Sequence, residues 1–447
     1  MNAHAPAVPG PLARYLLLGV TVLGTMSNNI INVPLRTIAD DFDQPISTAV
    51  LSVSAFILVL AVAMPITGWL GDRFGPKTVL VLALLLMVAG QIAAALAPNL
   101  GFLIGMRAVQ GLACSAIPPM VMGMLVVFFP GERLRMMGAW AAANGVGQAI
   151  GPPVGGLISD VLGWRAIFAI MALASLLVLL GIARTVPHLE GRHSRLHLLG
   201  ALLLSTGTAL LLVALTALSL AAVPQGISGL VALLGIILLG GFLLVSRNND
   251  RAMIPPHLII ESRFLRSSVA AFAQMFTLGT VLVLMPLYLT GTLALSLSQA
   301  GILFFVLPLT MALMAPVVSR LSNRASPRLV LRSGLVIIIA GGLGTGALID
   351  GRSDPSVLVP VSALLAALGV GMAMVQTPAA AGATRSPAGS RGAAIGLFNM
   401  LRFSGSTAGT AWVALVYPLD DLLLLFAGCA AIASLGLALS FVGPDPA

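Results

Sequence analysis

Long apolar runs separated by short polar connections make up most of this chain of 447 residues. A helix needs about 20 mostly apolar residues to cross the hydrocarbon core of a bilayer. By that measure the pattern predicts fourteen membrane-spanning helices, over residues 12–34, 47–70, 77–97, 102–129, 135–158, 166–184, 196–218, 226–245, 266–290, 299–319, 328–349, 356–379, 391–417 and 422–442. The predicted fold class is therefore an all-α integral membrane protein.

Two polar connections, at 185–195 and 246–265, divide these runs into groups of six, two and six. Two groups of six suggest internal repeats, a common construction among secondary transporters. We therefore predict three domains: an N-terminal six-helix bundle over 1–187, a central linker with two extra transmembrane helices over 188–250, and a C-terminal six-helix bundle over 251–447.

Composition and charge also point to a bilayer. Hydrophobic residues make up 58% of the chain and charged residues 8%, whereas a soluble domain carries about 25% charged residues. The net charge of +9 raises the question of a nucleic-acid partner, but the basic residues are scattered between apolar runs. Eighteen of the 23 Lys and Arg residues fall in one alternating set of connections and three in the other. The positive-inside rule then predicts a multi-pass protein of the plasma (inner) membrane with both termini in the cytoplasm, and no nucleic-acid partner.

The connection after the second run, GWLGDRFGPKTVL at 68–80, is the most specific motif. Its glycines allow a tight turn and a close approach of helices. Its charges lie at the membrane edge, where they can pair with other charges or cap a helix. The candidate gating residues are Gly68, Gly71, Asp72, Arg73, Gly75 and Lys77. The related segment at 319–331 has Asn323 in place of the acid and Ser326 in place of a glycine, which does not favour a second gate of the same kind.

A second group of small residues lies in the fifth run, in GQAIGPPVGG at 147–156. Small residues four apart give a helix a smooth face for close packing, and the two prolines remove backbone donors and bend the helix. Such a helix can serve as a hinge or a seal, and ordinary packing between membrane helices is the alternative. The candidate residues are Gly147, Gly151, Pro152, Gly155 and Gly156.

These motifs resemble those of the major facilitator superfamily: its G-x-L-a-D-r-x-G-r-k loop at 68–80, its R-x-x-Q-G motif at 107–111 and its antiporter motif at 147–156. With fourteen runs, the chain is most similar to the fourteen-helix drug:proton antiporter-2 family, over nearly its whole length. The resemblance implies the major facilitator fold, with two six-helix bundles and two extra central helices. It also implies that Asp72 belongs to a charge network latching the bundles in the outward-open state, that Arg107 acts in proton handling or substrate contact, and that transport is export.

One departure from the family concerns the first run. The family's first helix typically reads L-D-x-T-x-x-N-x-A-L-P, and its acid is associated with cation recognition and proton exchange. This chain has Ser27 at that position, in MSNNIINVPLR at 26–36. Because a serine does not titrate, neither role is assigned to this position.

Arg107 and Arg402 are the two charges inside the predicted spans, and no Asp or Glu falls within any of them. A charge in hydrocarbon costs roughly 2.5–3.5 kcal/mol on insertion scales and usually faces a cavity or a partner. Arg107 lies near the outer edge of its run, where snorkelling is the alternative to a function. Arg402 lies deeper, which favours an anion-attracting role, with structural pairing to backbone carbonyls as the alternative.

Further candidates for the substrate or proton pathway are amides in the apolar runs. Asn28 and Asn32, four residues apart, are predicted to share one helix face, where they either line the pathway or bond to neighbouring helices. The other amides can serve either role: Gln110, Asn144, Gln148, Gln274, Gln376 and Asn399. Trp69 and Trp164 are interpreted as interface anchors, and Trp140 as a pocket candidate.

The sequence predicts a secondary active transporter that exports small organic molecules or drugs by alternating access, with protons as the coupling ion. The first alternative is an exporter of anionic or zwitterionic metabolites without a membrane-embedded acidic proton carrier, because both charges within the spans are arginines. The second is a membrane sensor or scaffold that does not transport. With no catalytic set and no metal-ligand spacing in the sequence, we predict no enzyme activity, no metal and no cofactor. The predicted partners are a small-molecule substrate, protons and the lipid bilayer.

Overall fold

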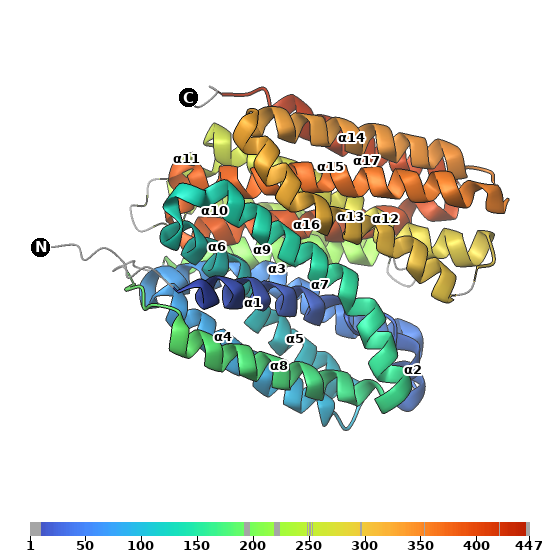
Figure 1. Ribbon diagram of the computed structural model, residues 1–447, viewed down its shortest axis with the longest axis horizontal. Helices are drawn as coiled ribbons and strands as arrows, with labels where there is room; N and C mark the ends of the chain where they lie inside the picture. Colours follow the sequence, from blue (N-terminus) through green and yellow to red (C-terminus); the bar gives the residue numbers. More distant parts are fainter. Residues whose placement is uncertain are drawn as a thin grey trace, which may run out of the picture. The chain divides into compact units, whose positions relative to one another are not determined.

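The computed structural model describes residues 10–191, 197–218, 224–247, 249, 252, 254–295, 297–352, 354–419 and 421–443. Within these ranges all regular elements are helical (Figure 1). The α-helices are α1 (Pro11–Asn29), α2 (Leu35–Asp41), α3 (Ile46–Phe74), α4 (Pro76–Ala95), α5 (Leu100–Ser115), α6 (Ile117–Phe128), α7 (Arg133–Leu162), α8 (Trp164–Thr185), α9 (Leu198–Leu218), α10 (Gln225–Arg247), α11 (Pro256–Ile259), α12 (Ser262–Leu287), α13 (Leu297–Arg324), α14 (Pro327–Ile349), α15 (Leu358–Arg385), α16 (Gly392–Val416) and α17 (Leu422–Leu439). The all-α class predicted from the hydropathy pattern is confirmed.

Each of the fourteen predicted spans has a helical counterpart, with two differences in detail. The fourth is broken at Ala116 into α5 and α6, because the following Pro118 and Pro119 supply no backbone N–H donors. The first ends at Asn29 instead of residue 34. In the described part of the chain, eleven helical segments are long and apolar enough to cross a membrane.

The helices α1, α7 and α16 are not among those eleven. Each covers one of the predicted spans, but each also carries several polar side chains. In α7 these include Asn144 and Gln148, and in α16 Asn399 and Arg402. These three helices hold ten of the 21 gating and pathway candidates named from the sequence.

The described chain forms two compact units. Unit 1 comprises the described residues within Met1–Met136, Ala143–Leu196 and Ser390–Asn399, and unit 2 those within Met137–Ala142, His197–Gly389 and Met400–Ala447. The long helices α7 and α16 each contribute residues to both units. The central pair α9 and α10 falls in unit 2, and the division into three domains at 187 and 250 stays a prediction.

Close packing in unit 1 joins α1 and α7. A side chain on Gly155 would overlap the carbonyl oxygen of Ile30, and one on Gly147 would come within 2.7 Å of the carbonyl oxygen of Val22. Positions four residues apart lie on one helix face. On this face the backbone of α7 therefore packs directly against the backbone of α1 and the residue that follows it, as the glycine spacing predicts.

Unit 2 repeats this arrangement with α12 and α16. A side chain on Gly405 would overlap the carbonyl oxygen of Phe272, and one on Gly409 would overlap that of Phe276. Both units thus contain a glycine stripe, four residues in period, that lies directly on the backbone of another helix. This similarity supports the interpretation of the chain as two internal repeats.

Candidate transport site

The motif at 68–80 forms the end of α3, a turn at Gly75 and the start of α4. Gly75 has a φ of 87°, a conformation that favours glycine. The turn lies against the segment after α8, where a side chain on Gly75 would overlap the carbonyl oxygen of Leu189. Lys77 donates a hydrogen bond of 2.9 Å to the carbonyl oxygen of Ala183, near the end of α8. Glycine is therefore required at position 75 both by its conformation and by its neighbour.

The remaining residues of the motif lie on the last turns of α3. A side chain on Gly71 would overlap the side chain of Met120 on α6. Arg73 is exposed, and its guanidinium carbon lies 5.9 Å from the ring centroid of Trp69 and 5.6 Å from that of Phe74. Trp69 itself is buried, so its interpretation as an interface anchor is wrong.

Asp72 binds the first turn of α16, within unit 1. Its Oδ1 accepts from the backbone N–H of Gly392 at 2.7 Å, and its Oδ2 from that of Ala393 at 3.2 Å. The first N–H groups of a helix have no partner within it and lie at the positive end of its dipole, so a carboxylate suits them. A side chain on Gly68 would overlap the Gly392 carbonyl oxygen. The glycine and the acid of the motif therefore act on the same helix end.

Arg107, on α5, is completely buried and has hydrogen-bond partners. Its two terminal nitrogens donate to the carbonyl oxygens of Ser27 at 2.9 Å and Asn28 at 3.4 Å, and to Oε1 of Gln110 at 3.0 Å. The ring centroid of Phe56 lies 4.2 Å from its guanidinium carbon. The two carbonyls belong to the end of α1, where the negative end of the helix dipole favours a cation. The snorkelling alternative is wrong, because the side chain is enclosed.

Position 27 lies inside this hydrogen-bonded cluster. The Ser27 hydroxyl accepts from Nε2 of Gln91 at 3.2 Å, and Nε2 of Gln110 donates to the carbonyl oxygen of Gly90 at 2.9 Å. The residue that replaces the family's acid is thus buried, and its own backbone carbonyl oxygen accepts from Arg107. Arg107 therefore donates its hydrogen bonds here to backbone carbonyl oxygens, and not to a carboxylate.

Asn28 and Asn32 do not share a helix face, so this prediction is wrong. Because proline disfavours the helical conformation of the residue before it, α1 does not continue to Pro34. The helix ends at Asn29, and Asn32 is exposed in the turn that follows. Asn28 stays half-buried, and its Oδ1 has no hydrogen-bond partner among the described residues.

The motif in α7 stays helical through Pro152 and Pro153. Beside the glycine stripe, Gly156 approaches Val33, whose side chain would lie 3.1 Å from an added Cβ. The side chain of Gln148 is half-buried. Asn144 is buried, and its Oδ1 accepts from the hydroxyl of Thr25 on α1 at 3.1 Å. This helix is therefore joined to α1 by both backbone packing and a hydrogen bond.

Arg402, on α16, is 1% exposed. None of its three guanidinium nitrogens has a hydrogen-bond partner among the described residues. Its guanidinium carbon lies 5.2 Å from the ring centroid of Trp140 and 5.1 Å from that of Phe403. All three residues belong to unit 2. The structure therefore places this cation beside two aromatic rings, with no carbonyl oxygen of the described chain bonded to it.

Two buried glutamines in unit 2 also lack partners. Neither the oxygen nor the nitrogen of the Gln274 and Gln376 amides has a hydrogen-bond partner in the described ranges. Gln274 lies seven residues after Ser267, on the same face of α12, and Ser267 contacts Gly382 of α15. Gln376 precedes Gly382 by six residues, so the two amides lie at similar depth on packed, antiparallel helices. They stay candidates for the pathway.

Asn399 is a buried amide of unit 1. Its Nδ2 donates to the carbonyl oxygen of Ile395 at 3.0 Å and contacts Sδ of Met122 at 3.4 Å. Its Oδ1 has no partner in the described part of the chain. The amide is thus half-satisfied, and its role in the pathway stays a prediction.

A family model described as the Major Facilitator Superfamily matches residues 16–410 of the chain. The chain belongs to the major facilitator superfamily. It is therefore a multi-pass membrane transporter, and the predicted family and fold are confirmed. No Asp or Glu is buried among the described residues of this major facilitator transporter, and three arginines are, namely Arg107, Arg266 and Arg402.

Similar proteins support the same assignment. An uncharacterized MFS-type transporter of Mycobacterium tuberculosis, Rv1250, is 28% identical over 91% of this chain and 70% of its own length. The riboflavin transporter RibZ of Clostridioides difficile is 28% identical over 80% of this chain and 78% of its own length. The crystal structure of the human organic anion transporter MFSD10 has a TM-score of 0.70 at 18% identity, covering 96% of this chain and 100% of that one. At that identity the likeness concerns the fold.

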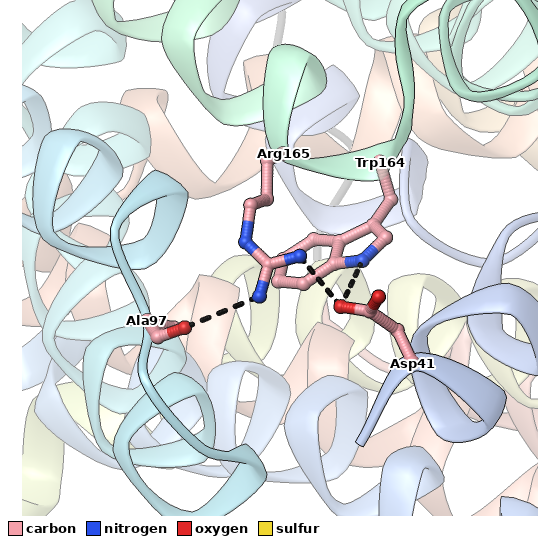
Figure 2. Close-up of polar contacts among 4 residues, drawn as sticks. All are labelled: Asp41, Ala97, Trp164 and Arg165. Atoms are coloured by element: carbon pink, nitrogen blue, oxygen red, sulfur yellow. Dashed lines mark hydrogen bonds and ion pairs between the residues drawn. The ribbon is translucent and has the colours of Figure 1, made fainter. Parts of the chain in front are cut away.

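A polar cluster at the start of α8 was not predicted from the sequence of this transporter. Figure 2 shows Asp41 of α2 accepting from both Trp164 and Arg165, while Arg165 also reaches the carbonyl oxygen of Ala97. The distances are 3.2 Å to the indole nitrogen of Trp164 and 2.5 Å to Arg165. The Arg165 hydrogen bond outweighs burial and lowers the pKa of Asp41. Trp164 is buried, so its interpretation as an interface anchor is wrong.

The end of α17 was missed as well. Arg328 donates to the carbonyl oxygens of Ser440 at 2.6 Å and Gly443 at 3.1 Å, and Arg332 donates to that of Ser440 at 3.1 Å. Arg266 donates to the carbonyl oxygen of Val442 at 3.1 Å. These carbonyl oxygens belong to the C-cap residue and the turn that follow α17, which ends at Leu439. Arginines that the sequence assigns only to membrane orientation therefore hold the turn after this helix.

Proposed function

We propose that this transporter exports small organic molecules by alternating access, from a plasma membrane in which both termini lie in the cytoplasm. The observation that carries the proposal is the contact of Asp72 with the N–H groups of Gly392 and Ala393. A carboxylate on a helix end makes a strong but breakable contact, about 1.5–3 kcal/mol for a hydrogen bond to a charged group. Such a contact suits a latch that forms in one state of the cycle and opens in the next.

Export, as opposed to import, is supported by the resemblance of residues 147–156 to the family's antiporter motif. Gly147 and Gly155 lie close to the backbone at Val22 and Ile30. Close packing of this kind suits a sealed pathway in a carrier that moves its cargo against a gradient. The riboflavin transporter among the relatives makes a small organic molecule a reasonable cargo class.

Proton coupling is part of the proposal, but its carrier differs from the family's. The described residues hold no buried carboxylate, and Ser27 occupies the position of the family's acid. The remaining acids are at the edges: Asp41 is paired with Arg165, whereas Asp72 holds a helix end. A proton on Asp72 would weaken its grip on α16, which would couple proton uptake to the change of state.

The test is transport by the purified protein in liposomes with an imposed pH gradient, using cationic dyes and organic anions as probes. Gradient-driven movement of any probe supports export with proton antiport. Asp72→Asn keeps the size of the side chain but removes its charge, and we expect a rate about tenfold lower. Asp43→Asn, at an exposed acid, is the matched control. Absence of movement for every probe, with folded protein, would overturn the proposal.

A further inference from the structure

Arg402 is an enclosed cation that meets no anion among the described residues. Its Nε and both terminal nitrogens are buried and make no hydrogen bond to the described residues. A guanidinium group has five N–H donors and keeps its charge at neutral pH. A buried charge with no partner is among the most destabilising arrangements in a protein. The environment of Arg402 is therefore one that a bound anion would complete.

Two other arginines of the same chain make the hydrogen bonds to backbone carbonyl oxygens that are expected of a structural role. Arg107 is equally buried, yet it donates to two carbonyl oxygens and a glutamine. Arg328 donates to the carbonyl oxygens of three residues after α17, the shortest at 2.6 Å. Arg402 has no comparable bond in the described ranges. Pairing with backbone carbonyls, the structural alternative for this residue, does not apply there.

The aromatic rings beside Arg402 can attract its charge but do not replace hydrogen-bond acceptors for its N–H groups. Trp140 and Phe403 lie 5.2 Å and 5.1 Å from its guanidinium carbon. A ring face attracts a cation, but it does not accept the parallel N–H bonds that a guanidinium fork makes to a carboxylate. The rings also supply a flat apolar surface beside the charge. A ligand that complements these groups would carry an anionic head on an apolar, ring-containing body.

We propose that Arg402 binds the carboxylate of a transported organic acid, with the ring system of that acid lying against Trp140. This rests on the proposed export function and names its substrate class. A carboxylate matches the planar fork of arginine in two parallel hydrogen bonds. A cationic dye would bring a second positive charge into the same buried space, where no described Asp or Glu is buried to offset it.

The test uses the purified full chain in lipid nanodiscs and three probes of one shape: 2-naphthoate, its methyl ester and 2-naphthylmethylammonium. We expect only 2-naphthoate to raise the Tm of the wild type. Arg402→Met, which removes the charge, should weaken its binding by about 100-fold. Arg402→Lys should weaken it less, because the charge remains without the fork. Arg247→Met, at an exposed arginine, should bind as the wild type does.

Three results would overturn the proposal: no shift of the wild-type Tm with 2-naphthoate, equal binding of the acid and its ester, or an unchanged Kd in Arg402→Met. The probe series on the wild type decides the question even if Arg402→Met does not fold. Efflux from liposomes is measured separately. Binding that depends on Arg402 without efflux would keep the site and remove the export function, whereas efflux of naphthoate by Arg402→Met would keep export and remove the site.

Discussion

Arg107 in unit 1 and Arg402 in unit 2 are both buried arginines on membrane helices, and they differ in what they touch. Arg107 holds two carbonyl oxygens at the end of α1. Arg402 contacts two aromatic rings, and its nitrogens have no hydrogen-bond partner in the described part of the chain. In the sequence both are charges placed in hydrocarbon, and they differ there only in their depth within the run. The comparison teaches that partners, and not depth alone, separate a structural charge from one available to a ligand.

The largest effect is expected from Arg107→Met, with Arg402→Met as its comparison. Arg107→Met leaves the carbonyl oxygens of Ser27 and Asn28 buried without donors, so we expect the free energy of unfolding to fall by about 3–5 kcal/mol. Arg402→Met removes an unpaired buried charge and should leave stability equal or higher. Thermal unfolding of both variants in one detergent measures the difference. Equal losses of stability would abolish the distinction between the two arginines.

The glycine stripes of the two units provide the next comparison. Gly155→Ala forces a methyl group onto the carbonyl oxygen of Ile30, and Gly409→Ala onto that of Phe276. We expect each variant to lose about 1–3 kcal/mol of stability, as overpacked cores do. The matched control is Gly105→Ala, where no atom lies within 4 Å of the added group. If only one of the two Gly→Ala variants loses stability, the two units are not equivalent repeats.

A smaller effect is expected at the start of α12, where Glu261 accepts from the backbone N–H groups of Arg263 and Phe264 at 2.9 Å each. Its Oε2 also accepts from the Ser386 hydroxyl at 2.6 Å. Burial acts to raise the pKa of Glu261, but these hydrogen bonds outweigh it and lower the pKa below its ordinary value of 4.5. Glu261→Gln should cost about 0.5–2 kcal/mol, as the loss of an N-cap does.

The pH dependence of this variant follows from the lowered pKa. The stabilisation by Glu261 is fully present above the unfolded-state pKa and is lost as the pH falls through the folded-state pKa. The difference between wild type and Glu261→Gln should therefore be constant near pH 7 and shrink below about pH 4. Unfolding at a series of pH values checks this. A difference that persists in acid would mean that the contact does not depend on charge.

The smallest effect is expected in the exposed cluster of Figure 2. The Asp41 and Arg165 side chains are 42% and 44% exposed, and pairs of this kind contribute about 0–1 kcal/mol. Asp41→Asn should therefore change the Tm little, and less still in high salt, which screens exposed charges. A large loss of stability would show that the indole N–H of Trp164, and not the ion pair, depends on this carboxylate.

Helix positions and packing motifs could be predicted because they are local properties. Apolar length marks the spans, and glycines four residues apart mark the face of α7 that lies on another backbone. The similar stripe of α16 was found only in the structure. The partners of Arg107 could not be predicted, because they depend on where α1 ends. The same ending placed Asn32 outside the helix. The isolation of Arg402 is likewise a property of the packed helices, which no single segment of sequence contains.

The three arginines around the end of α17 have a consequence for how the topology of this protein can be mapped. During insertion, Arg266, Arg328 and Arg332 are signals that keep their connections on one side of the membrane. After folding, the same side chains donate to carbonyl oxygens of the turn that follows α17. Charge-neutralising substitutions at these positions would disturb both biogenesis and the finished structure. Experiments that map the topology with reporter fusions should therefore use substitutions at Arg320 and Arg324. Both are exposed, and they lie on the last turns of α13, next to the start of α14 that holds Arg328 and Arg332.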